Sequence, residues 1–116
     1  MRETDFARYL TQFLSIYLPG QVGSKRNTQL AYRDSFSLFL KYCRDQKNLS
    51  PEKLTIAQVD KELVICFLQW LEEERNCKAA TRNQRLAAIH SFFSFLMVEE
   101  PQYMQQSQKI LAIPMK

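Results

Sequence analysis

The chain has 116 residues, of which 46% are hydrophobic and 24% are charged. These are ordinary globular values and exclude a disordered chain, which would be poorer in apolar residues. The length predicts one domain, because typical domains have roughly 100–150 residues. Two glycines and four prolines are few over this length and favour long helices over a many-turned sandwich or barrel. We therefore expect an all-α fold, a single compact bundle of about four to five helices.

The net charge of +4 comes from 16 basic and 12 acidic residues. It suits a nucleic acid or another anionic partner, although so mild an excess selects neither. Three cysteines without C-x-x-C spacing and a single histidine, His90, support neither a disulfide scaffold nor a zinc site. We expect no metal and no cofactor.

The longest apolar run, from Leu63 to Leu68, is far shorter than the ~20 residues that a membrane span needs. No charged leader with an apolar core opens the sequence. We expect a soluble, cytoplasmic protein with no membrane partner.

The first predicted helix begins at Thr4 or Asp5, either of which can cap it, and ends at Pro19-Gly20. Its apolar residues recur at helical spacing. They are Phe6, Leu10, Phe13, Leu14 and Tyr17. Residues 20–24 form a connector that contains both glycines.

A second helix is predicted from Ser24 to about Asp45. One face is mainly apolar and carries Thr28, Tyr32, Ser35, Phe36, Phe39 and Cys43. The opposite face forms a polar, mostly basic stripe of Arg26, Arg33, Ser37, Lys41 and Arg44. The helix is therefore expected to be amphipathic, with its cations in solvent.

Ser50-Pro51 resembles a helix start and predicts one short helical turn. Asp60 can cap a longer helix, whose broad apolar face from Leu63 to Leu71 ends at three glutamates, Glu72 to Glu74.

The next helix is predicted to start at Asn76 or Cys77 and to stop before Pro101. Its apolar stripe is Leu86, Ile89, Phe93 and Leu96. Traced backwards, the same line of the helix becomes cationic at Arg85, Arg82 and Lys78, so we expect its first two turns to project beyond the core. Phe92 and Phe95 cannot both share the inner stripe, which predicts that one of them is partly exposed.

A short final helix is predicted from Pro101 to Lys109. Residues 110–116 are expected to be extended, because Pro114 disfavours helix in the residue before it. The domain is therefore assigned to residues 1–109, and residues 110–116 follow it as a linker.

The positive charge is concentrated in two places. Ser24 to Lys47 contains six basic and two acidic residues, and Lys78 to His90 contains three basic residues and no acid. Asp60 to Arg75, in contrast, has two basic and five acidic residues. Both basic segments lie at helix starts, where free N–H groups and the helix dipole help to hold phosphate. Solvated helix faces are the alternative reading of the same charges.

The order of motifs resembles the core-binding domain of tyrosine recombinases, the phage integrase family. Ser24 to Phe39 carries the spacing T-x-x-x-Y-x-x-x-x-x-x-F, and Leu63 to Leu71 includes F-L-x-x-L. Ala80 to Phe93 is similar to the family stretch A-T-x-N-x-R-L-x-A-I-R-x-F-F. Residues 110–116 look like the linker into the catalytic domain. Two positions depart from the pattern: Lys78 stands where the family often has Ser, and His90 where it often has Arg.

The resemblance implies a SAM-like helical domain that binds duplex DNA sequence-specifically and contributes to DNA integration and recombination. Its implied partners are double-stranded DNA, a C-terminal catalytic domain of the same parent chain, and other recombinase protomers on the DNA. Chemistry in the family belongs to that C-terminal domain, and no tyrosine here lies in a nucleophile-like context. We therefore expect the chain to bind DNA without cleaving it.

The candidate DNA-binding residues lie in the two basic segments, and the strongest are Arg82 and Arg85. The full set is Ser24, Lys25, Arg26, Asn27, Thr28, Tyr32, Arg33, Lys78, Thr81, Arg82, Asn83 and Arg85. Two readings stay open within it: Asn27 can instead cap the second helix, and Tyr32 can be a core residue. A helical protein-interaction module with a basic face is the competing function. A helix-turn-helix repressor is disfavoured, because no short helix pair with a tight glycine turn is present.

Overall fold

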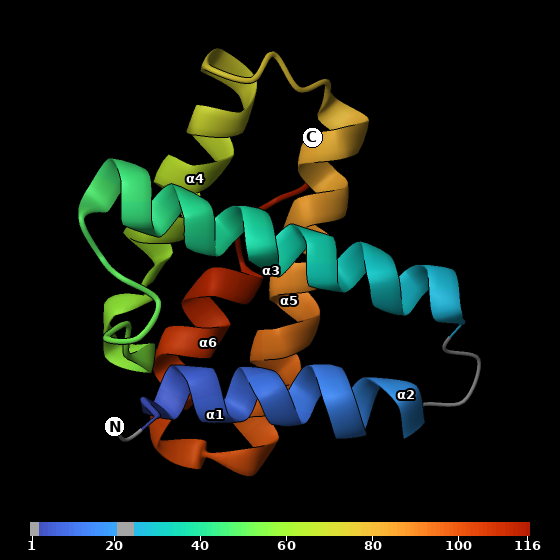
Figure 1. Ribbon diagram of the computed structural model, residues 1–116, viewed down its shortest axis with the longest axis vertical. Helices are drawn as coiled ribbons and strands as arrows, with labels where there is room; N and C mark the ends of the chain where they lie inside the picture. Colours follow the sequence, from blue (N-terminus) through green and yellow to red (C-terminus); the bar gives the residue numbers. More distant parts are fainter. Residues whose placement is uncertain (1–2, 21–24) are drawn as a thin grey trace. The chain divides into compact units, whose positions relative to one another are not determined.

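The computed structural model describes residues 3–20 and 25–116 (Figure 1). All regular elements in these ranges are helical, which confirms the all-α prediction. The chain divides into two compact units, one through Ile56 and one from Ala57 onward, and each is treated separately below. No helix among the described residues is both long enough and apolar enough to cross a membrane.

The first unit begins with a continuous helical stretch of α1 (Asp5–Gln12), the π-helical turn η1 (Phe13–Tyr17) and α2 (Leu18–Gly20). Thr4 caps α1 as predicted, because its hydroxyl accepts the Ala7 N–H at 3.1 Å. The π turn was not predicted. It ends at Tyr17, two residues before Pro19, which has no N–H to donate, and the Leu18 N–H bonds back to the Phe13 carbonyl five residues earlier.

The long helix α3 (Arg26–Lys47) follows in the first unit. The unit ends at Ile56, the first residue of the 3₁₀ turn η2 (Ile56–Gln58). Its predicted inner face is confirmed at Ser35, Phe36, Phe39 and Cys43, which are buried together with Tyr42. The prediction was wrong at Thr28, which is exposed, and Tyr32 is half-buried. Helix α3 ends at Asn48, whose φ of 55° lies in the left-handed region that commonly terminates helices.

The second unit is built from α4 (Lys61–Glu73), α5 (Ala79–Glu99), η3 (Pro101–Tyr103) and α6 (Met104–Leu111). Asp60 caps α4 as predicted, with Oδ1 accepting the Leu63 N–H at 2.9 Å. Both α4 and α5 pack against α6. The predicted stripe of α5 is buried in full.

Three local expectations for the second unit were wrong. Lys78, rather than Asn76 or Cys77, precedes the first turn of α5. Phe92 and Phe95 are both buried, because α5 is covered over more than one narrow stripe. Helix α6 continues two residues past Lys109, so Ile110 and Leu111 are helical rather than extended; Ile110 and Ile113 are buried.

Candidate nucleic-acid interface

The start of α3 presents two cations, Lys25 and Arg26, beside the polar residues Asn27 and Thr28, and all four are exposed. Lys25 occupies the N-cap position without a side-chain cap, and Asn27 lies inside the first turn rather than at the cap. Because the first N–H groups of a helix have no intrahelical partner, this turn offers backbone donors as well as charge. Ser24 lies outside the described residues.

The predicted basic stripe of α3 is exposed along its whole length, from Arg26 through Arg33 and Lys41 to Arg44. Arg44 makes an ion pair with Asp45, with Nε and Oδ1 2.9 Å apart. Their hydrogen bond raises the pKa of the Arg44 guanidinium and lowers the pKa of the Asp45 carboxyl. The charge of Arg44 is thus partly neutralised by its neighbour Asp45.

Tyr32 is half-buried, and its ring stacks on that of Phe13 with centroids 6.3 Å apart and planes 13° apart. This stacking fits the core-packing reading of Tyr32.

The starts of α3 and α5 share two features that the starts of α1 and α4 lack. Neither has a side-chain cap or an acidic residue in its first turn. Helices α1 and α4, in contrast, are capped by Thr4 and Asp60 and carry Asp5 and Glu62 in their first turns. Helix α6 also has neither a side-chain cap nor an acidic residue in its first turn, but η3 leads directly into it, so α3 and α5 are the long helices whose N-termini are open to an external anion.

At the start of α5, Lys78 is exposed, whereas Thr81, Asn83 and Arg85 are half-buried. Arg82 is only 6% exposed, so the expectation that the first two turns project beyond the core is wrong at this residue. The reason is the segment of residues 113–116, which folds back along α5. Arg82 Nη1 donates to the Pro114 carbonyl at 2.9 Å, and Asn83 pairs with the backbone of Lys116.

Glu72, at the end of α4, completes this polar cluster. Its Oε1 lies 3.6 Å from Arg82 Nε, which makes an ion pair but is too long for a hydrogen bond, and both of its carboxylate oxygens accept from Lys116 Nζ at 2.8 Å. The sequence placed Glu72 only at the acidic end of the predicted helix. The contact was not foreseeable from spacing, because its partners lie 10 and 44 residues further along the chain.

His90 is half-buried, with Nε2 3.1 Å from the Ile110 carbonyl oxygen. Since a carbonyl only accepts, Nε2 carries the hydrogen. Burial lowers the pKa of His90, the nearby Arg82 charge lowers it further, and the Ile110 carbonyl opposes this shift. The position at which the family often has Arg therefore ties α5 to α6 here.

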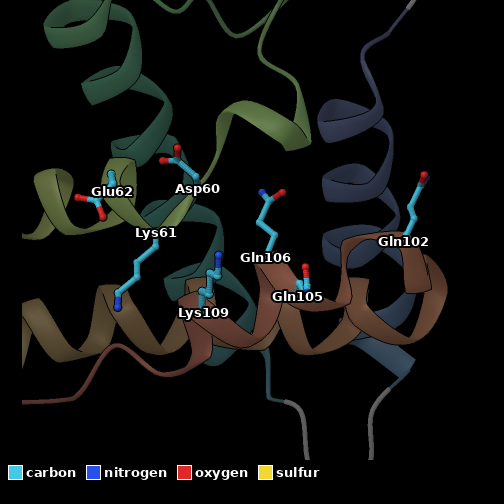
Figure 2. Close-up of a pocket in the computed structure, with 7 residues that line it drawn as sticks. All are labelled: Asp60, Lys61, Glu62, Gln102, Gln105, Gln106 and Lys109. Atoms are coloured by element: carbon cyan, nitrogen blue, oxygen red, sulfur yellow. The ribbon is translucent and has the colours of Figure 1, made fainter.

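A hollow of 420 Å³ lies elsewhere in the second unit (Figure 2). It is lined by Asp60, Lys61, Glu62, Gln102, Gln105, Gln106 and Lys109. Asp60 is occupied by capping α4, and Gln106 donates to the Val59 carbonyl at 2.7 Å. No cluster of three metal-ligating side chains occurs within residues 3–20 and 25–116. The hollow is a polar surface depression without a nucleophile.

The family model described as "Phage integrase, N-terminal SAM-like domain" matches residues 10–100. Two proteins of Sinorhizobium fredii (strain NBRC 101917 / NGR234) are also similar. "Putative integrase/recombinase y4rC" is 34% identical over 115 residues, which cover 99% of this chain and 35% of that protein. "Putative integrase/recombinase y4rD" is 34% identical over 111 residues, which cover 92% of this chain and 40% of that protein.

No solved structure gives a significant match. The chain spans little more than a third of the length of these two relatives. The family match, in contrast, extends over most of the chain and includes both basic helix starts. The chain therefore belongs to the phage integrase N-terminal SAM-like domain family.

Proposed function

We propose that this domain binds double-stranded DNA for a site-specific tyrosine recombinase and positions that DNA without cutting it. The observation that carries the proposal is the pairing of positive charge with open helix N-termini at α3 and α5. Phosphate is stabilised by both features together, whereas a cation on a helix flank provides only one of them.

Membership of the integrase family supports DNA as the anion in question. We assign the chemistry of strand cleavage to another part of the parent protein, because the family match is to an N-terminal SAM-like domain and the chain has a single histidine. Other protomers of the recombinase are its proposed partners on DNA.

The proposed contact residues divide by their surroundings. Lys25, Arg26, Arg33 and Lys78 are exposed and are proposed to meet phosphates. Asn27 and Thr28 lie beside them and are proposed to read base edges or phosphates. Thr81 and Arg85 are half-buried at the edge of the α5 cluster.

The proposal is tested by titrating a fluorescent duplex with the wild-type chain, Lys78→Ala and Lys109→Ala at low salt. Both lysines are exposed and belong to the second unit, but only Lys78 lies at the start of α5. We expect Lys78→Ala to weaken binding several-fold and Lys109→Ala to have little effect. Equal effects of the two substitutions would point to non-specific charge attraction.

An acidic polypeptide distinguishes the competing protein-interaction function. Polyglutamate carries the same sign of charge as DNA but lacks base edges and a phosphate backbone. A domain selected for DNA is expected to prefer the duplex at equal charge concentration and to select among duplex sequences. Stronger binding of polyglutamate than of any duplex would contradict the proposed function.

A further inference from the structure

Asn83 makes a two-point contact with the backbone of Lys116, 33 residues later. Its Nδ2 donates to the Lys116 carbonyl at 2.8 Å, and its Oδ1 accepts the Lys116 N–H at 2.9 Å. An amide group that donates and accepts in this way pairs with the main chain and is indifferent to the side chain at that position. The contact therefore fixes the path of the chain rather than recognising lysine.

Arg82 reinforces the same contact from the neighbouring position. Its Nη1 donates to the Pro114 carbonyl at 2.9 Å and to Asn83 Oδ1 at 3.1 Å. A buried guanidinium is costly unless paired, and the Glu72 carboxylate lies beside it. The side chains of Arg82, Asn83 and Glu72 thus all bond to residues 114–116. In the same segment, the side chain of Ile113 is buried.

Lys116 is held in two separable ways. Its backbone pairs with Asn83, whereas its ammonium group bonds the Glu72 carboxylate. The side chains of Lys116 and Glu72 are 53% and 31% exposed, so water weakens their ion pair. The backbone pairing is also exposed, whereas the bond from Arg82 to the Pro114 carbonyl is part-buried, so Arg82 and Asn83 together are expected to hold this segment more firmly than the ion pair does.

We propose that Arg82 and Asn83 are positioning residues, which fix residues 113–116 along the first turns of α5 and thereby set the direction of any chain that follows Lys116. This role goes beyond DNA binding and gives both residues a function other than direct DNA contact. Under the proposed function, DNA meets the same end of α5 through Lys78. The bound DNA and any chain that follows Lys116 are then held in register by one helix.

The positioning role is tested on the whole chain without DNA, by amide exchange and ¹⁵N relaxation. In Asn83→Ala, the residue 116 amide is expected to exchange about tenfold faster, because the hydrogen bond that protects it is lost. Lys116→Ala keeps the backbone pairing and serves as the matched control, whereas Lys116→Pro removes the N–H donor. Met115 is expected to become mobile in Asn83→Ala and Lys116→Pro, and to stay ordered in Lys116→Ala.

The double variant Asn83→Ala, Lys116→Pro is expected to be no more mobile than Asn83→Ala alone, because Asn83→Ala already removes both hydrogen bonds, including the one that Lys116→Pro removes. Arg82→Lys keeps the charge but loses the planar fork, and is expected to mobilise residues 113–116 while the domain stays folded. Residues 113–116 that stay ordered in both Asn83→Ala and Arg82→Lys would overturn the proposal.

DNA affinity separates this inference from the proposed function. Asn83→Ala is expected to retain duplex affinity within about twofold, whereas Lys78→Ala reduces it and leaves residues 113–116 ordered. A loss of affinity in Asn83→Ala without added mobility would overturn the positioning role and make Asn83 a DNA contact. No loss in Lys78→Ala would contradict the proposed DNA surface alone, because the mobility experiment contains no DNA.

Discussion

Removal of two cations from the basic stripe of α3 tests whether that stripe is a DNA contact or a solvated face. Arg26 and Arg33 lie seven residues apart, and therefore on one face of the helix, and both are exposed. If each neutralises one phosphate, the double variant Arg26→Ala, Arg33→Ala lowers the slope of log K against log salt by about 1.8. The corresponding loss of affinity is about 200-fold at ~50 mM salt and about 20-fold at ~200 mM, in the limit of pure counterion release.

The control is Lys41→Ala, Arg44→Ala, which removes the same charge from the same stripe. Lys41 lies about 12 Å along the helix from Arg33, and Arg44 about 27 Å from Arg26. These separations exceed the Debye length of about 10 Å at 0.1 M salt, so the control pair is expected to change the slope little.

The measurement is fluorescence anisotropy of a labelled duplex over a salt series, with circular dichroism to verify that both variants keep their helices. Equal slopes for the two double variants would refute the assignment of the DNA surface to the start of α3. The stripe would then be the solvated face of an amphipathic helix.

Three further predictions concern the buried groups. Because the pKa of His90 is lowered in the folded chain, the unfolded chain binds the proton more tightly. The free energy of unfolding is therefore highest above the unfolded pKa of about 6.5 and falls as the pH drops below it. Urea midpoints measured at successive pH values should show this fall, and His90→Gln should flatten it. Ser107 is fully buried, and its Oγ has no hydrogen-bond partner among the described residues, so Ser107→Ala should keep or raise the melting temperature. Ser35→Ala should lower the melting temperature, because Ser35 Oγ donates to the Ala31 carbonyl at 3.0 Å. Burial raises the pKa of the Cys43 thiol to about 12, so a thiol reagent at pH 8 should modify Cys43 only as fast as the native chain opens; rapid modification of the folded chain would contradict that burial.

The sequence was informative where the signal is local. Thr4 and Asp60 cap their helices as predicted, because a cap bonds an N–H only three residues away. The apolar stripe of α5 is buried because helical periodicity already places Leu86, Ile89 and Phe93 on one face.

Capping residues and helical periodicity did not predict contacts between residues far apart in the sequence. The charge pattern treated Arg82 as a solvent-facing cation, since Lys78, Arg82 and Arg85 lie in line on the helix. The backbone of Pro114 and the carboxylate of Glu72 turned Arg82 inward, and neither partner has a periodic relation to it. The DNA contacts themselves stay a prediction.

By itself, therefore, the sequence determined the helical class, the helix faces, the two basic helix starts and the integrase family, because each depends on spacing within a few turns or on an ordered set of motifs. Only the tertiary structure decided which cations remain exposed. The return of residues 113–116 onto α5 buried Arg82 and left Lys78 exposed, because a guanidinium removed from water is stabilised by carbonyl and carboxylate groups that the fold brings from elsewhere in the chain.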